Sequence, residues 1–218
     1  MEINQLISKR IHPLNLQTPI TQVHQLFNQL TYSHLPVIEN DVLLGAVFED
    51  DAKNYDSNNV LSDYQYELDL FFVKEHTNWL DVIEAFAKNE SNIMPVLNSD
   101  NKYIGYYELT EVLDLFHATP FLSEPGGILV VEKGLKDYSF GEIAQIVESN
   151  NGKLLGAFIS EAKDDMVQIT LKINNSNLNE VLQTFRRYSY NVIFGNDDDV
   201  FIDTLKDRSA YLDRYLNM

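Results

Sequence analysis

In the first half of the chain, apolar residues pass from helical spacing to short strand-like runs in an order that occurs twice, 59 residues apart. In the first copy, Thr21 is the predicted N-cap of a helix whose apolar positions are Val23, Leu26, Phe27 and Leu30. In the second copy, Thr77 or Asn78 is the predicted cap, and the apolar positions are Leu80, Val82, Ile83, Phe86 and Ala87. The pattern therefore predicts one amphipathic helix near the start of each copy.

A short apolar run that contains a proline follows each helix, at 34–38 and at 93–97. Proline suits the first position or the edge of a strand, where its missing N–H is tolerated. After a turn, a second apolar run contains one glycine, Gly45 or Gly105, and a glycine inside a strand marks a bulge or a close backbone approach. A second helix is predicted after each of these strands. Each copy then reads as a β-α-β-β-α unit.

A different pattern begins after Pro125-Gly126-Gly127, a sequence that strongly favours a turn. A helix that starts with a capping box, Ser139 and Glu142, is predicted to end with Gly152 in the left-handed conformation. Asn177 is the predicted cap of a second helix, which has Leu178, Val181, Leu182 and Phe185 on its apolar face. The predicted strands are 128–131, 153–159, 166–173 and 190–194. The order β-α-β-β-α-β is that of a ferredoxin-like unit.

The last part of the chain, 197–218, contains a run of three aspartates and then apolar residues at roughly helical spacing. The run 197–199 lacks the glycine and the distal glutamate of an EF-hand, so a solvated turn is expected there rather than a calcium site. A C-terminal helix is predicted from Asp203 onward. Its apolar face can pack either on its own domain or on a partner.

The chain has 218 residues, with 16 Lys and Arg against 33 Asp and Glu, and its formal net charge is −17. This charge repels phosphate groups, so we expect neither nucleic acid nor an anionic membrane surface as a partner. The absence of cysteine excludes disulfides, thiolate metal sites and a cysteine nucleophile. We see no signal peptide and no apolar stretch long enough to span a membrane. We therefore expect a cytoplasmic protein.

The two copies share further residues around their prolines and glycines. Pro36 and Pro95 are each followed by valine and an aliphatic residue, and an acid, Asp51 or Glu111, stands six residues after each glycine. This pattern resembles a CBS domain, and two copies in tandem resemble a CBS pair, or Bateman module. The leads at 3–7 and 60–64 are also similar to the segment that opens each CBS unit. The resemblance covers residues 1 to about 117 and implies one CBS repeat at 1–57 and a second at 58–120.

After a CBS pair, the β-α-β-β-α-β segment at 126–196 resembles an ACT-like domain, and the whole chain resembles the acetoin-utilisation type of CBS protein. The implied fold class is α+β, with an acidic turn and a C-terminal helix at 197–218. ACT domains often bind amino acids between paired subunits through a glycine-containing turn after the first strand, which here contains Gly134. A dimerising or partner-docking sheet is the simpler interpretation.

CBS pairs commonly bind AMP, ATP or S-adenosylmethionine as regulatory ligands in the cleft between the two units. The family's site combines strand residues near the Pro-Val step with a hydroxyl residue that approaches phosphate and an aspartate that accepts from the ribose hydroxyls. The residues that the resemblance implies for such a site are Thr18, His34, Leu35, Pro36, Phe48, Asp51, Thr77, Ile93, Pro95, Glu108 and Glu111.

This sequence departs from the family pattern in both copies. Phe48 replaces the hydroxyl residue in the first copy, and Glu108 stands at that position in the second, where it would repel a phosphate. Asp51 keeps the ribose acceptor, so the first cleft is the better candidate, and ligands without phosphates face less repulsion. Structural roles remain open, since Asp51 can cap a helix while Phe48 and His34 can be core residues. The candidate cations are His34, Lys53, Lys74 and His76.

No catalytic motif or metal-ligand spacing is found, and the five histidines lie far apart in the sequence, so we expect neither an enzyme nor a metal site. Three functions remain open. The first is a ligand-sensing regulatory module, the second is a constitutive dimerisation or scaffold protein with degenerate clefts, and the third, which the sequence favours least, is an unrecognised enzyme. A homodimer is expected because the first helix of each copy exposes a second apolar edge, with Leu26 and Leu30 in one and Phe86 in the other. The sequence does not identify a partner protein.

Overall fold

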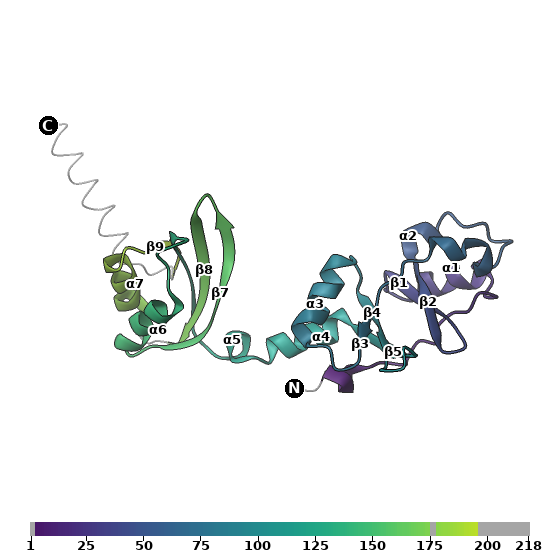
Figure 1. Ribbon diagram of the computed structural model, residues 1–218, viewed down its shortest axis with the longest axis horizontal. Coiled ribbons are helices and arrows are strands. Elements are labelled where there is room, and N and C mark those ends of the chain that lie inside the picture. The colour runs from purple at the N-terminus through teal and green to yellow at the C-terminus, as the bar shows by residue number, and fades with distance from the viewer. Residues whose placement is uncertain (1–2, 175–177, 196–218) are drawn as a thin grey trace. The chain divides into compact units, whose positions relative to one another are not determined.

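The computed structural model describes residues 3–174 and 178–195. The chain divides into two compact units between His117 and Ala118, and each unit combines helices with β-strands (Figure 1). The cap expected at Asn177, the acidic turn at 197–199 and the C-terminal helix lie outside the described residues. Among the residues that are described, no helix has both the length and the apolar character needed to cross a membrane.

The first unit contains the two copies of the repeat. The first copy consists of the 3₁₀ helix η1 (Ile3–Leu6), α1 (Ile20–Gln29), β1 (His34–Glu39), β2 (Val42–Phe48) and α2 (Glu49–Ala52). The second consists of η2 (Leu61–Glu67), β3 (Val73–Lys74), α3 (Trp79–Lys88), β4 (Ile93–Leu97), β5 (Tyr103–Glu108) and α4 (Leu109–His117). β1 pairs with β2, and β4 pairs with β5, both antiparallel. The valine after each proline lies opposite the glycine, as Val37↔Gly45 and Val96↔Gly105, so the two hairpins have the same register.

The two copies fold against each other around a local pseudo-twofold axis. Ser33 and Asn92 occupy equivalent positions, 59 residues apart, and they bond to each other. The Ser33 backbone N–H and hydroxyl donate to Asn92 Oδ1 at 2.8 and 3.1 Å, and the Asn92 N–H donates to Ser33 Oγ at 3.1 Å. Because equivalent residues can touch only close to the axis that relates them, this contact marks where the axis passes.

Each copy begins with a lead, the segment before its first α-helix, at residues 3–19 in the first copy and 60–78 in the second. Each lead crosses to the other copy. Ser8 exchanges backbone hydrogen bonds with Tyr106 of β5, at 2.8 and 3.1 Å. In the same way, Asp69 exchanges bonds with Ala46 of β2, at 2.8 and 2.9 Å. The hydrophobic core of the second copy accordingly includes Ala46 from the first. The repeat predicted from the sequence is therefore an interlocked pair.

Both glycines lie where a lead crosses a strand. Their φ angles are 155° at Gly45 and 144° at Gly105, and the strand register shifts beside each of them. A Cβ at Gly105 would lie 2.5 Å from the Ser8 carbonyl oxygen, and one at Gly45 would lie 2.8 Å from the Leu68 Cβ. The prediction of a bulge or a close backbone approach is confirmed at both positions, because both features are present.

Two sequence predictions about the helices of the first unit need correction. The cap predicted at Thr21 is wrong, since α1 begins at Ile20, whose N–H donates to the Asn59 carbonyl at 3.1 Å. Phe86 is only 2% exposed and belongs to the core, so it does not form an exposed apolar edge. Of the two caps predicted for α3, Asn78 is the one that caps it, accepting from the Leu80 N–H.

The second unit has the element order β-α-β-β-α-β. After the short α5 (Pro120–Ser123), it consists of β6 (Gly127–Gly134), α6 (Phe140–Ser149), β7 (Lys153–Lys163), β8 (Met166–Asn174), α7 (Leu178–Arg187) and β9 (Asn191–Phe194). The sheet order is β7-β8-β6-β9 with every neighbour antiparallel, which is the ferredoxin-like order. Burial alternates strictly along β8, as its sequence pattern predicts.

The end of α6 differs from its prediction by one residue. Asn151 has the left-handed φ of 57°, and Gly152 follows it. The Asn151 N–H donates to the Glu148 carbonyl and the Gly152 N–H to the Val147 carbonyl, both at 3.0 Å. This is a Schellman motif with asparagine, the residue other than glycine that tolerates this position, in the left-handed place.

Candidate ligand clefts

The first cleft lies where β1 begins and β2 ends. His34 and Phe48 face each other in the register of this hairpin, and the lead of the second copy adds Asp69 and Phe71. The C-terminal end of α3 completes a cavity of about 330 Å³ with Lys88, Asn89 and Glu90. The cavity therefore lies between the two copies, and it exists because the second lead crosses onto β2.

Aromatic rings form the wall of this cleft. The His34 ring stacks on Phe48, with centroids 4.8 Å apart, and meets the edge of Phe71 at 5.1 Å. His34 is only 3% exposed, so its ring is a buried part of the wall. Such a surface can take a flat heteroaromatic ring by stacking.

A polar chain runs from the pseudo-twofold axis to the cleft through His34. Ser33 Oγ, which is bonded to Asn92, lies 2.9 Å from His34 Nδ1. On the other side of the ring, His34 Nε2 lies 3.5 Å from Asp69 Oδ2. Both nitrogens of the buried imidazole therefore face polar groups, which is what a buried histidine requires.

Burial lowers the pKa of His34, while the carboxylates of Asp69 and then Asp51 act in the opposite direction without reversing the shift. Asp51 itself is exposed in α2 and is not one of the residues that line the cavity. The folded protein thus favours the neutral ring, and Ser33 and Asp69 are the polar groups that contact it.

This shift predicts a pH dependence of stability. Because the folded-state pKa is depressed, the unfolded chain binds the proton more tightly, so stability is lost as the pH falls below the ordinary value of about 6.5. Relative to His34→Gln, the unmodified protein should lose at most about 1.4 kcal/mol per pH unit for this one proton. Urea unfolding at a series of pH values measures the difference. The matched control is His12→Gln, at an exposed histidine, which should follow the unmodified protein.

At the second cleft implied by the resemblance, the chain forms an ion pair of its own, in which the Arg10 side chain is 64% exposed. Arg10, from the first lead, places Nη2 2.5 Å from Glu108 Oε1 and 2.7 Å from Glu111 Oε1. Its Nε donates to Ser8 Oγ at 3.2 Å. The two carboxylates raise the pKa of Arg10, which stays charged. Arg10 thus neutralises the acidic pair that, by the resemblance, would face a ligand.

Two tyrosines pack beside this ion pair. The rings of Tyr32 and Tyr106 meet edge to face at 5.9 Å. Burial raises the pKa of Tyr32, and hydrogen bonding to Tyr106 and Glu108 adds to the shift. The phenol therefore remains neutral, and aromatic and ionic contacts of the chain itself flank the acidic pair.

Sequence reasoning did not identify Arg10. The residue lies in an irregular lead, 98 residues before Glu108 in the sequence, and no periodic pattern points to it. The one usable signal was that two glutamates at the start of a helix need a nearby cation. The other cations named from the sequence have different partners, since Lys53 pairs with Glu49 and Asp50. Lys74 bonds to Asn98 and Asn101, and His76 to Asn4.

The remaining residues implied by the resemblance lie outside both clefts. Four are buried core positions: Leu35, Pro36, Ile93 and Pro95. Thr18 Oγ1 accepts from the Asn15 N–H at 3.1 Å, and Thr77 Oγ1 donates to the Lys74 carbonyl at 2.7 Å, so both hydroxyls close turns. The structure thus brings His34 and Phe48 together in the first cleft and Glu108 and Glu111 together in the second, while Asp51 is exposed outside the lining of the first cleft. Within the described ranges, no cluster of three or more His, Asp or Glu side chains could hold a metal ion.

Comparison with known proteins places the first unit. The family model of the CBS domain matches residues 3–58 and again residues 63–118. A CBS domain pair/ACT domain protein from Thermotoga maritima is similar in structure, at 18% identity and a TM-score of 0.47 over 53% of this chain and 96% of that one. The structure of CBSX2 in complex with AMP is 20% identical, with a TM-score of 0.44 over 53% and 95% of the two chains.

A third similar structure is the cytosolic domain of the Mg²⁺ channel MgtE in complex with ATP, at 16% identity and a TM-score of 0.45 over 52% of this chain and 48% of that one. None of the curated proteins compared with the chain matches it. CBS pairs are typically regulatory and non-catalytic, and no enzyme family is indicated. The two matches to the family model span more than half of the sequence, and the chain belongs to the CBS domain family.

Proposed function

We propose that this chain is a non-catalytic regulatory protein whose first cleft binds an adenosyl ligand that carries little negative charge. The observation that carries the proposal is the aromatic wall of His34, Phe48 and Phe71, with the exposed carboxylate of Asp51 three residues after Phe48 in the chain. The cavity of about 330 Å³ falls in the range of small-molecule sites, roughly 300–1,000 Å³. A purine can stack on the rings, while a carboxylate accepts from the two hydroxyls of a ribose.

The charges around the first cleft favour a ligand without a phosphate chain. Asp51, Asp69 and Glu90 are acidic, and Lys88 is the cation in the wall. Like charges in a partly buried site repel each other, so the triphosphate of ATP is expected to bind least well. Adenosine and the cationic S-adenosylmethionine fit this environment better. AMP and ATP are recorded for two of the similar structures, and both therefore belong in the test.

We expect a single ligand per chain, because Arg10 already pairs with both acids of the second cleft and a nucleotide there would compete with this ion pair. A ligand in the first cleft acts as a signal only if it binds two arrangements of the protein with different affinities. The polar chain from Asp69 through His34 to Ser33 and Asn92 connects that cleft to the seam between the copies.

Calorimetric titration with adenosine, S-adenosylmethionine, AMP, ADP and ATP tests the proposal. We expect one site per chain, the tightest binding for the ligands without phosphates, and about tenfold weaker binding in Asp51→Asn through loss of a charge-assisted hydrogen bond. Asp50→Asn is the matched control, because Asp50 is exposed and pairs with Lys53 on the same short helix. Equal affinity of Asp51→Asn and the unmodified protein, or a preference for ATP, contradicts the proposal.

A second candidate is a constitutive dimerisation scaffold. It is favoured by the ion pair at the second cleft and by the burial of His34 in the first. The absence of binding heat with all five ligands supports this candidate. In both cases we propose a homodimer, and a sedimentation mass near the 25.1 kDa of one chain at micromolar concentration contradicts it.

For the second unit we propose an ACT-like module of the acetoin-utilisation type that serves dimerisation or the docking of a partner. Support comes from its element order and its antiparallel sheet order, β7-β8-β6-β9. Gly134, at the end of β6, stands where an ACT domain has its ligand-binding turn. A docking role agrees with apolar side chains exposed on β7, where Phe158 and Ile159 are 45% and 42% exposed.

A further inference from the structure

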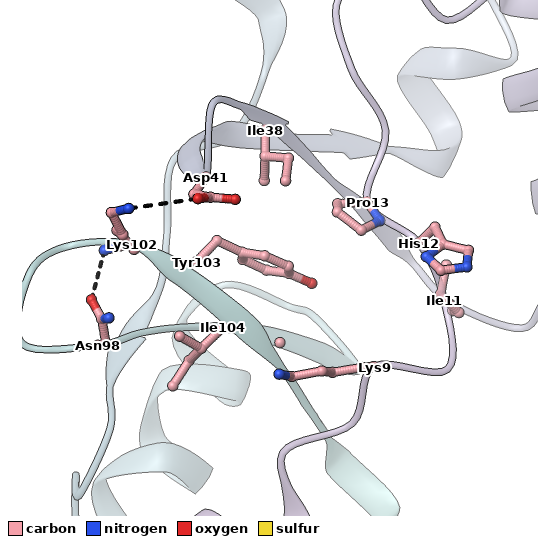
Figure 2. Close-up of a pocket in the computed structure, with 11 residues that line it drawn as sticks. Lys9, Ile11, His12, Pro13, Ile38, Asp41, Asn98, Lys102, Tyr103 and Ile104 are labelled. Atoms are coloured by element: carbon pink, nitrogen blue, oxygen red, sulfur yellow. Dashed lines mark hydrogen bonds and ion pairs between the residues drawn. The ribbon is translucent and has the colours of Figure 1, made fainter.

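A second cavity in the first unit lies at the opposite end of β1 from the first cleft. Its volume is about 440 Å³, larger than the 330 Å³ of the first cleft, and it shares no lining residue with that cleft. Its walls are the first lead, the turn after β1 and the start of β5 (Figure 2). Ile38 and Gly105 belong to the repeat pattern and line this cavity, but none of the ligand-site residues that the resemblance implies does, so it is a separate candidate site.

One part of the inner surface of this cavity is apolar. Ile38, Tyr103 and Ile104 are half-buried and line it together with Pro13 of the lead. Figure 2 shows Ile38 and Tyr103 approaching the same space from different strands. Burial raises the pKa of Tyr103, so its phenol stays neutral. A surface of this kind gains free energy by covering a hydrocarbon or aromatic body.

The rim carries an excess of positive charge, in contrast to the chain as a whole. Lys9, Lys102 and His12 stand around the opening, and Asp41 is the one carboxylate among the residues that line it. Lys102 Nζ lies 3.6 Å from Asp41 Oδ2, so these two charges offset each other (Figure 2). Within the part of the chain that the structure describes, the Lys9 ammonium has no hydrogen-bond or ion-pair partner, and this leaves one positive charge available to a ligand.

The other half of the pseudo-symmetric pair has an apolar residue in place of Lys9. Ser8 and Asp69 bond to equivalent strand residues, Tyr106 and Ala46, so Leu70 stands where the first lead has Lys9. The lysine of the second lead, Lys74, corresponds to another position and donates to the Asn98 carbonyl at 3.2 Å and to the Asn101 side chain. The available ammonium of Lys9 is therefore a property of one side of the pair and not a general consequence of the repeat.

We infer that this cavity binds a small organic anion with an apolar body, such as an aromatic or branched carboxylate. Its charged group would meet Lys9, and its body would lie against Ile38, Tyr103 and Ile104. The site is distinct from the first cleft and does not depend on it. A cationic or neutral molecule of the same shape gains less, because a hydrogen bond between two charged groups is stronger than one between neutral groups.

The test uses a series of probes with one shape and different charges. Phenylacetate, phenylacetamide and phenethylamine are titrated into the full chain while amide chemical shifts are followed, with hexanoate and phenyl phosphate as further anions. We expect saturable binding of the anions, with shifts at residues 9–13 and 102–105. Removal of the charge, in phenylacetamide or in Lys9→Gln, should weaken the binding of phenylacetate about tenfold.

Lys153→Gln is the control, because it removes the same charge from an exposed position in the second unit and should leave binding unchanged. Equal affinity for phenylacetate and phenylacetamide, equal affinity of Lys9→Gln and the unmodified protein, or no saturable binding by any of the three anions overturns the inference. Lys9→Gln should leave adenosine titrations unchanged, and Asp51→Asn should leave phenylacetate titrations unchanged. The proposals for the two sites can therefore be refuted independently of each other.

Discussion

Replacement of Gly105 by alanine is expected to lower the free energy of unfolding of the first unit by about 2–5 kcal/mol, as backbone strain and overpacking combine. The new Cβ would lie 2.5 Å from the Ser8 carbonyl oxygen and 2.6 Å from the Ile7 side chain, and the φ of 144° disfavours any residue except glycine. Relief of the clash would separate Ser8 from Tyr106 and break the two backbone hydrogen bonds that join the lead to β5. Urea unfolding followed by the fluorescence of Trp79, the one tryptophan, measures the loss in this unit.

Gly141→Ala, in the second unit, serves as the control with the opposite expectation, and circular dichroism follows its unfolding because Trp79 lies in the first unit. Gly141 is exposed near the start of α6, and a Cβ there would meet nothing closer than Ser139 Oγ at 3.6 Å. Alanine in a helix should be neutral or stabilising by up to about 1 kcal/mol. If Gly105→Ala unfolds at the same urea concentration as the unmodified protein, the close crossing of lead and strand is not present in solution.

The largest loss in the second unit is expected from Phe185→Ala, at about 3–5 kcal/mol for a fully buried phenylalanine. Phe185 is 0% exposed, lies in the centre of the core under the sheet, and meets the ring of Tyr190 edge to face at 5.5 Å. Truncation leaves a cavity that helix α7 and the sheet can fill only in part. Hydrogen exchange of peptides from β6 and β8 measures the effect in this unit.

The matched control is Phe158→Ala, which removes the same side chain from a position on β7 that is 45% exposed. Its expected loss is about 1 kcal/mol or less, since little apolar area leaves the interior. An equal effect of the two substitutions would contradict the assignment of Phe185 to the core.

The parts of the fold that could be predicted are those with a strong local pattern. The doubled spacing revealed the repeat, and strict alternation revealed β8, because one face of that strand is fully buried. Gly45 and Gly105 were informative because glycine weakens a strand and is kept there mainly where the backbone bulges or another segment comes close. In the second unit, the predicted order of helices and strands is also the order observed.

Contacts between distant segments could not be predicted in this way. The cap of α1 was missed because its first N–H is satisfied by Asn59, a partner far away in the sequence. Phe86 has the helical spacing of an exposed edge, but the second lead and α4 help to cover it. Arg10 and Lys9 lie in an irregular lead, where charge alone does not reveal which carboxylate or cavity a side chain reaches.

The contact of Ser33 with Asn92 has a consequence for how the two halves can move. A rotation of one half against the other about the pseudo-twofold axis displaces this contact least, since displacement grows with distance from the axis, so the contact can serve as the pivot. Ser33 also contacts the imidazole of His34, the next residue in the sequence, so a ligand that shifts that ring would act directly on the Ser33–Asn92 contact. A displacement in the first cleft would thus reach the pivot between the two halves through a single peptide unit.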